Sequence, residues 1–317
     1  PTGITVVTGF LGAGKTTLLD VIAGRKTGGH RRGTITLNGN EVEKQTFARL
    51  TAYCEQNDLH NEFATVGEAL EFSATLRLDD AVTAAQRRGF VSEALDILEL
   101  RPLRDRMIGK SGDANGLSPG QRKILTVAVE LVSNAPVFFL DEPTSGLDSR
   151  AALIVMSEVN KVAKMGRTVI STIHQPSREI FLMFDDMLLL QRGGWQVYFG
   201  PLGPSNASTF VSYMESLAST GYKKLPKGMN PASWMLDVLG GTDSSAAAGE
   251  ESKETGEVQD GKTLEDAFKA SKAGAAASAV VAELSRAEDG VEMFSFASEY
   301  ARTMPVQLAT ILARSHK

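Results

Sequence analysis

The sequence has few of the features that mark several large classes of protein. It holds a single cysteine, Cys54, which excludes an internal disulfide and suits a reducing compartment. No apolar run approaches the ~18 residues of a membrane span, and no signal peptide is visible. The net charge of −5 argues against a nucleic-acid partner. What remains is a chain of 317 residues with ordinary globular composition, long enough for one large domain or two small ones.

A glycine-rich stretch near the first residue is the most informative feature that is present. Residues 9–16 read G-F-L-G-A-G-K-T and fit the G-x-x-x-x-G-K-[ST] pattern of a phosphate-binding P-loop. The β-branched residues 4–8 before it predict a strand, and residues 17–23 after it predict a helix. We expect Lys15 to reach the β- and γ-phosphates and the Thr16 hydroxyl to bind Mg²⁺. The alternative is a glycine-rich turn that binds nothing.

Strands and helices alternate along the chain, which predicts a layered α/β sheet. Apolar residues at helical spacing predict a helical region over residues 66–100. Residues 137–140 form an apolar strand, and residues 151–163 a helix with Ser149 as its N-cap. A hairpin is expected around Gly193-Gly194, between the apolar residues 187–190 and 196–199.

Three polar residues follow predicted strands and are candidates for chemistry. Asp141 and Glu142 end the strand at residues 137–140, where Asp141 suits Mg²⁺ and Glu142 could polarise a water as general base. The alternative is a buried strand with a polar end. His174 ends the strand at residues 168–173, where a γ-phosphate contact competes with a merely structural role.

Two further sites, a helix start and a polar loop, are weaker evidence when taken alone. Ser118 and Gly120 precede a helix in L-S-P-G-Q, which describes either an anion site or a capped helix start. Gln56 lies in a polar loop and on local grounds could be an amide without a role.

The order of these motifs resembles an ABC-type ATPase domain: a P-loop, a glutamine loop, an L-S-x-G-Q signature, an apolar strand ending in Asp-Glu, S-G-L-D, and a histidine after the next strand. Other stretches are similar to the G subfamily and its pleiotropic drug resistance branch, namely A-G-R-K-T-G-G at 23–29, Q-R-K at 121–123, H-Q-P-S at 174–177 and V-Y-F-G-P-L-G at 197–203. N-P-A-S-W-M-L at 230–236 resembles the segment that follows the second ATPase domain of a full-length transporter.

The resemblance implies a P-loop NTPase fold: a mostly parallel sheet flanked by helices, with an inserted helical subdomain at roughly residues 60–133. The family's first strands and its adenine-stacking aromatic would lie upstream, so we expect the chain to be a fragment. The expected domains are an ATPase domain over residues 1–239, an acidic flexible linker over 240–272, and a basic helical segment over 273–317 leading towards a membrane domain.

The resemblance also implies that this domain pairs head to tail with a second ABC ATPase domain. The pair would bind ATP and Mg²⁺. Nucleotide-binding residues would be Gly9, Phe10, Leu11, Gly12, Ala13, Gly14, Lys15, Thr16 and Thr17 of the P-loop, Ser118, Gly120 and Gln121 facing the partner's P-loop, and Asp148 at the interface. Catalysis would involve Glu142, His174 and Gln56, and the metal ligands would be Thr16, Gln56 and Asp141. Pro119 replaces the first glycine of the signature and has no N–H to donate, from which we expect a modest effect.

The function implied is the cytosolic ATPase domain of a membrane exporter for lipophilic compounds or lipids, expected at the plasma membrane. Its transmembrane domains would belong to the same polypeptide, and no nucleic acid would be bound. Two alternatives stay open: a soluble ABC-type ATPase without a transport role, and a nucleotide-binding regulatory partner that hydrolyses poorly.

Overall fold

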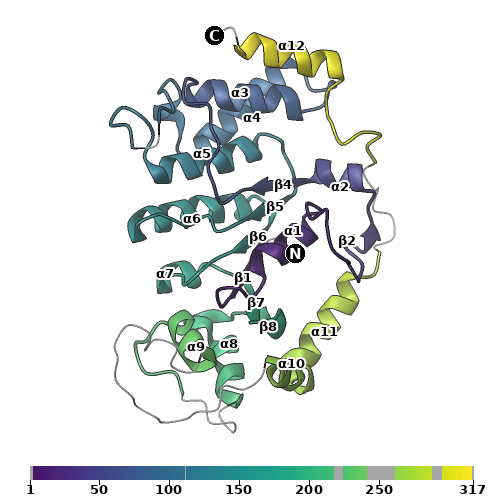
Figure 1. Cartoon of the computed structure of the whole chain (residues 1–317), viewed down its shortest axis with the longest axis vertical. Coiled ribbons are helices and arrows are strands. Elements are labelled where there is room, and N and C mark those ends of the chain that lie inside the picture. The colour runs from purple at the N-terminus through teal and green to yellow at the C-terminus, as the bar shows by residue number, and fades with distance from the viewer. Residues whose placement is uncertain (1–2, 111, 218–223, 241–260, 288–294, 316–317) are drawn as a thin grey trace. The chain divides into compact units, whose positions relative to one another are not determined.

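The computed structural model describes residues 3–110, 112–217, 224–240, 261–287 and 295–315 (Figure 1). The chain divides into two compact units. Unit 1 comprises residues 1–3, 20–170 and 287–317, and unit 2 comprises residues 4–19 and 171–286. The division passes through β6 (Thr168–Thr172), and the predicted nucleotide-binding residues are distributed over both units.

Unit 1 contains a pair of parallel strands. β5 (Val137–Leu140) pairs in parallel with β4 (Thr51–Cys54), and Phe138, Phe139 and Leu140 are buried. The apolar strand predicted at residues 137–140 is therefore confirmed. Thr168, at the start of β6, donates its N–H to the carbonyl of Pro136 just before β5 (3.0 Å).

The helices of unit 1 include those predicted for the inserted subdomain. Between residues 44 and 164 this unit contains α2 (Lys44–Leu50), α3 (Val66–Arg77), α4 (Ala84–Ile97), the 3₁₀ turn η1 (Arg101–Leu103), α5 (Pro119–Leu131) and α6 (Ser149–Lys164). The helical region predicted over residues 66–100 is confirmed, and it contains two helices, α3 and α4. The break has a local cause, because Thr83 starts α4 with a capping box to Gln86. A short hairpin, β2 (Thr36–Leu37) with β3 (Asn40–Glu41), also belongs to this unit.

In unit 2 the strands follow the sequence prediction closely. β1 (Gly3–Gly9) pairs in parallel with β7 (Asp186–Gln191), and β7 forms an antiparallel hairpin with β8 (Trp195–Pro201). Ile173, just after β6, donates its N–H to the carbonyl of Val7 in β1 (3.2 Å). Apart from the β2–β3 hairpin, the strand pairs are thus parallel except for β7 with β8. The expected α/β fold class is confirmed.

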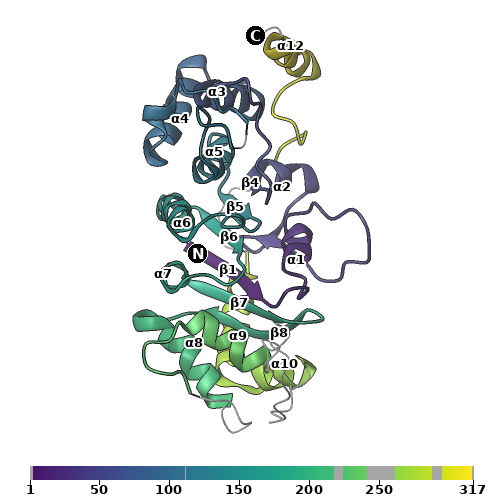
Figure 2. The same ribbon diagram turned by 60° about the vertical axis from the view of Figure 1, so that its left-hand side comes forward.

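Unit 2 contains the helices α7 (Arg178–Phe181), α8 (Pro204–Ser216), α9 (Pro231–Gly240), α10 (Gly261–Ala270) and α11 (Lys272–Leu284). Figure 2 shows α8, α9 and α10 beside the β7–β8 hairpin. α10 and α11 contact β8, and the ring of Phe268 in α10 lies 5.9 Å from that of Tyr198 and 5.6 Å from that of Tyr213.

The linker predicted over residues 240–272 is therefore wrong at its C-terminal end. Residues 241–260 lie outside the described residues, but α10 begins at Gly261 and buries Leu264 and Phe268. Four residues apart, these two side chains form an apolar stripe, and burying it stabilises the helix against the sheet.

The last described helix, α12 (Met304–Ser315), belongs to unit 1 and contacts α3. Arg302 precedes it and is buried, donating its Nε to the carbonyl of Thr75 (2.8 Å) and pairing with Asp80. The helical character expected over residues 273–317 is present in α11 and α12, whereas residues 295–303 are not helical. Among the described helices, none combines the length and the apolar composition needed to cross a membrane.

Candidate functional site

The P-loop joins β1 to α1 (Lys15–Ile22) in unit 2. Its turn depends on Gly12 and Gly14, whose φ values of 77° and 87° are strained for residues with a side chain. Among the described residues, no heavy atom lies within 4 Å of the place where a Cβ would stand at either glycine. The space beside both glycines is therefore open, and a turn of this kind suits the oxygens of a phosphate chain.

Lys15 is the first residue of α1, and its side chain turns back over the loop. Its ammonium donates to the carbonyl oxygens of Phe10 (3.0 Å) and Gly9 (3.2 Å), and the residue is 6% exposed. Thr16 and Thr17, which follow it, are exposed. The loop thus combines a cation held by carbonyl oxygens with hydroxyl groups at a helix N-terminus, the chemistry expected of a phosphate site.

His174 lies in unit 2, two residues after the end of β6, and is exposed. The next residue, Gln175, has a φ of 46°, so the chain turns sharply there. Asn230 donates its side-chain amide to the carbonyl of Pro176 (3.1 Å), and Ser177 caps α7 through the N–H of Ile180 (3.3 Å). These bonds hold Pro176 and Ser177, which directly follow the turn.

In unit 1 the predicted carboxylates follow β5 as expected. Asp141 is 6% exposed and extends the strand pairing through its N–H to the carbonyl of Cys54 (2.9 Å). Glu142 has a φ of 44°, a left-handed conformation that costs a non-glycine residue on the order of 1–3 kcal/mol. The carbonyl of Glu142 accepts from the N–H of Ser145 (3.0 Å), which closes the turn.

Gln56 lies beside this turn. Its side-chain amide donates to Oε2 of Glu142 (2.9 Å) and to Oγ of Ser145 (3.3 Å). The structure therefore brings together Gln56 and Glu142, two of the three predicted catalytic residues, although they are far apart in sequence. Ser145 was not predicted as a site residue, because its S-G-L-D motif indicated only family membership.

The signature residues form the start of α5 in unit 1. Oγ of Ser118 accepts the N–H of Gln121 (3.3 Å), and Oε1 of Gln121 accepts the N–H of Ser118 (2.9 Å). This is a complete capping box, so the capped helix start is real. Pro119 occupies the first helical turn, where an N–H would have no intrahelical partner, and its replacement of glycine costs the helix no bond. Gly120 is buried, and an added Cβ would lie 3.3 Å from Cβ of Ala151 in α6.

Asp148 caps α6, although Ser149 was the predicted N-cap. Oδ1 of Asp148 accepts the N–H groups of Arg150 and Ala151, both at 2.9 Å, and Ser149 is the first helical residue. A carboxylate at this position accepts two bonds and complements the helix dipole better than a hydroxyl. Asp148 remains exposed.

Comparisons with known proteins agree with this geometry. Residues 1–145 match the family described as ABC transporter, and residues 174–304 match the family described as ABC-2 type transporter. ABC transporter G family member 34 of Oryza sativa subsp. japonica is 43% identical over 316 residues, which is 100% of this chain and 20% of that protein. Pleiotropic drug resistance protein 1 of Petunia axillaris is 52% identical over 238 residues, 75% of this chain and 16% of that protein.

The chain carries an ABC transporter ATPase domain of the G-family, pleiotropic drug resistance type. The solved structure of CbiO1 from Clostridium perfringens, described as part of an ABC transporter complex, has the same fold. Its TM-score is 0.56 at 22% identity, covering 69% of this chain and 83% of that one. The chain spans about a fifth of the length of the curated relatives that it matches.

The donor groups of this ATPase domain suit a magnesium ion bound together with a nucleotide. In unit 2 Thr16 offers a hydroxyl oxygen, and in unit 1 Gln56 and Asp141 offer an amide and a carboxylate oxygen. All three are the hard donors that Mg²⁺ prefers. Within the described ranges, no group of three or more His, Cys, Asp and Glu side chains could hold a metal ion. Magnesium bound with a nucleotide usually takes several of its ligands from phosphate and water.

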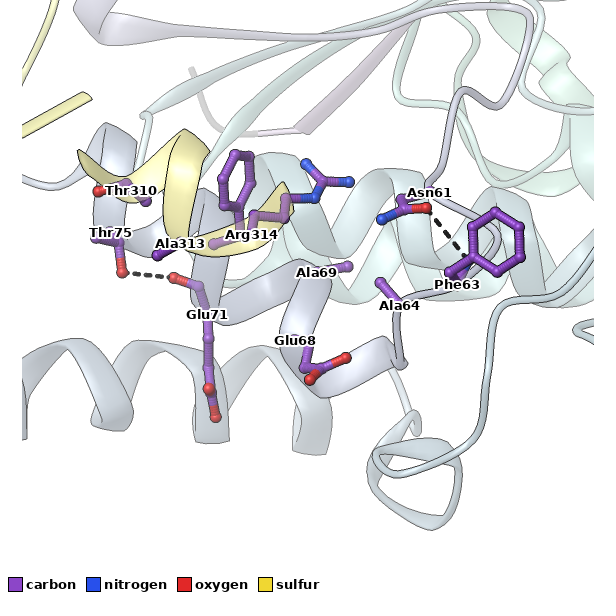
Figure 3. Close-up of a pocket in the computed structure, with 11 residues that line it drawn as sticks. Asn61, Phe63, Ala64, Glu68, Ala69, Glu71, Thr75, Thr310, Ala313 and Arg314 are labelled. Carbon is purple, nitrogen blue, oxygen red and sulfur yellow. Dashed lines mark hydrogen bonds between the residues drawn. The ribbon is translucent and has the colours of Figure 1, made fainter. Parts of the chain in front are cut away.

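A pocket in unit 1 lies away from these residues, between α3 and α12 (Figure 3). Glu68 and Thr75 of α3 line it together with Thr310 and Arg314 of α12. The guanidinium of Arg314 lies 4.3 Å from the ring centre of Phe72, which helps to hold α12 on α3. None of the predicted site residues lines this pocket. The pocket is therefore part of the contact between α3 and α12 and not of the predicted nucleotide site.

Proposed function

We propose that this ATPase domain binds and hydrolyses ATP on the cytosolic side of a membrane exporter, and that the energy drives export of lipophilic compounds or lipids. The names of the relatives, which include transporters of the G family and a pleiotropic drug resistance protein, support this. Because the chain spans about a fifth of those relatives, transport, substrate and membrane are proposed for the whole protein.

The proposed nucleotide-binding role begins with the P-loop. Residues 9–17 would hold the phosphates through backbone N–H groups, and Lys15 would neutralise the β- and γ-phosphates. Thr16, Gln56 and Asp141 would hold the magnesium ion. A bound Mg²⁺ supplies positive charge that offsets the charge of the phosphates.

The proposed hydrolytic role rests on one observation, the 2.9 Å bond from the Gln56 amide to the Glu142 carboxylate. A carboxylate oriented by an amide can accept a proton from a water molecule that attacks the γ-phosphorus. His174 would contact the γ-phosphate and orient that water. This pair favours a hydrolysing domain over one that only binds nucleotide.

The proposed partner is a second ABC ATPase domain in a head-to-tail arrangement. Ser118, Gly120 and Gln121 would contact the ATP bound by the partner's P-loop, and Asp148 would contact the partner itself. The exposure of Ser118 and Asp148 is consistent with such an interface. Transmembrane domains of the same polypeptide, in the plasma membrane, would complete the transporter.

Glu142→Gln in the full-length transporter tests the proposal. The amide keeps the shape of the side chain but cannot take a proton, so ATP hydrolysis should fall by roughly 10²–10⁴-fold while ATP binding persists. Phosphate release and nucleotide binding would be measured on the same preparation. Glu41→Gln, on the exposed end of the β2–β3 hairpin, is the control and should leave both unchanged. Phosphate release from Glu142→Gln near the wild-type rate would show that Glu142 is not the base.

A further inference from the structure

One face of α5 holds the loop that carries Gln56. Lys123, Thr126 and Glu130 lie three and four residues apart, so their side chains share a face of the helix. Each makes contact with the segment that runs from β4 through the Gln56 loop. The signature thus begins a helix whose body is bonded to another site element of the same unit.

Lys123 makes the most direct of these contacts. It is 2% exposed, and its Nζ lies 2.8 Å from Oδ1 of Asp58. The same ammonium donates to the carbonyl oxygens of Gln56 (2.8 Å) and Glu55 (3.2 Å). An ammonium has three donors, and here all three have acceptors, which is the condition for burying such a charge.

The neighbouring contacts hold both sides of the loop. Oγ1 of Thr126 lies 2.6 Å from Oδ1 of Asp58 and 2.9 Å from Nε2 of His60. One turn further on, Oε2 of Glu130 accepts the N–H of Tyr53 in β4 (3.2 Å). The loop is therefore bonded to α5 before, at and after Gln56.

The backbone and the side chain of Gln56 consequently have different partners. Its carbonyl is held by Lys123, while its amide reaches Glu142 and Ser145. A shift of the carbonyl would carry the amide with it, and a displacement of about 1 Å at a reacting group can cost on the order of a hundredfold in rate.

We propose that Lys123 is a positioning residue for ATP hydrolysis: it fixes the Gln56 backbone so that the Gln56 amide stays bonded to Glu142, and it couples this geometry to the helix that the signature begins. This inference rests on the proposed function. It predicts that movement of α5 on contact with a second ATPase domain is transmitted to Glu142 through Lys123.

A comparison of single and double variants at Lys123 and Gln56 in the full-length transporter tests the inference. Lys123→Met keeps the length of the side chain but removes the charge and all three donors, so kcat should fall on the order of tenfold with KM for ATP unchanged. If Lys123 acts through Gln56, the double variant Lys123→Met/Gln56→Ala should be no slower than Gln56→Ala alone. Arg122→Met is the matched control: Arg122 is also buried in α5, but it donates to the carbonyls of Ile108 and Gly109. Its effect should add to that of Gln56→Ala.

A second measurement does not depend on turnover. Without nucleotide, hydrogen exchange over residues 53–60 should be faster in Lys123→Met than in wild type, and unchanged in Arg122→Met. If Lys123→Met does not fold, Asp58→Asn weakens the same ion pair and should give the same two results in milder form. Additive losses, or unchanged exchange, would overturn the role of Lys123. Wild-type turnover that persists in Glu142→Gln would instead overturn the proposed function.

Discussion

Two helix N-termini in this molecule resemble each other as sequence motifs but differ as structures. At α1 the chain turns through Gly12 and Gly14 in left-handed conformations, and space remains open over both. At α5 the side chains of Ser118 and Gln121 close a reciprocal capping box. At the first terminus the turn depends on glycines and the Lys15 ammonium bonds to carbonyl oxygens, whereas at the second the side chains of Ser118 and Gln121 accept backbone N–H groups.

The difference indicates which part of an active site one chain can build by itself. A loop of backbone N–H groups around open space is prepared for phosphate before any partner arrives. A capped, exposed helix start offers a hydroxyl at its surface but does not surround a ligand. This is the pattern expected if the P-loop binds its own nucleotide and the signature completes a site on another domain.

Of the variants considered, Lys15→Ala should have the largest effect on ATP binding at the first of these two helix N-termini. It removes the ammonium that the carbonyls of Gly9 and Phe10 hold over the P-loop, so ATP affinity should fall on the order of tenfold to a hundredfold. Binding of a fluorescent ATP analogue to the full-length transporter would measure this. Lys26→Ala, an exposed lysine just after α1, is the control. Equal affinities for Lys15→Ala and wild type would remove the phosphate role of Lys15.

Substitutions at Ser118 sharpen the comparison. Ser118→Ala should lower stability by about 1 kcal/mol, because the N-cap bond is lost. Ser118→Asp keeps a cap acceptor and should preserve the melting temperature. Its negative charge would repel a phosphate, so turnover of the assembled transporter should fall at least about tenfold.

The two variants together separate a cap from a ligand contact. Thermal unfolding and phosphate release would be measured for both. A Ser118→Asp transporter with wild-type turnover would mean that the signature serine only caps α5.

Acid stability gives the smallest expected effect. His60 contacts the carbonyl of Arg122 (3.2 Å) and Thr126 on α5, and burial lowers the pKa of its imidazole. The folded chain then takes up the proton less readily than the unfolded chain, so stability is lost as the pH falls through and below about 6.5.

His60→Gln should therefore reduce the decline in melting temperature between pH 7 and pH 5 by roughly a degree or two. The exposed His30, changed to Gln, is the control. An identical decline in wild type and His60→Gln would contradict the assignment.

The parts of the fold that could be predicted have local causes. The strand at residues 137–140 is four apolar residues followed by two acids, and the β7–β8 hairpin turns at two glycines. The P-loop, the capping box at Ser118 and the two carboxylates after β5 were likewise readable, because each depends on neighbours in sequence. The break between α3 and α4 was missed although Thr83 and Gln86 form a recognisable capping pair.

The remainder depends on distant contacts. The linker expected over residues 240–272 extended too far, because in α10 Leu264 is buried and the ring of Phe268 packs against that of Tyr198 in β8. In the sequence, Lys123 had no feature that distinguished it from other charged residues on a helix. Only the fold shows that it is buried beside Asp58, which lies in a different loop.

The central claim is that hydrolysis needs residues from two ATPase domains, and ATP turnover by this chain at increasing protein concentration tests it most directly. Without a tether to raise the effective concentration of a second domain, turnover per molecule should be near zero in dilute solution and should rise with concentration. It should stay below that of the full-length transporter at every dilution. Robust turnover that is independent of concentration would contradict the account, since a single domain would then complete its own site.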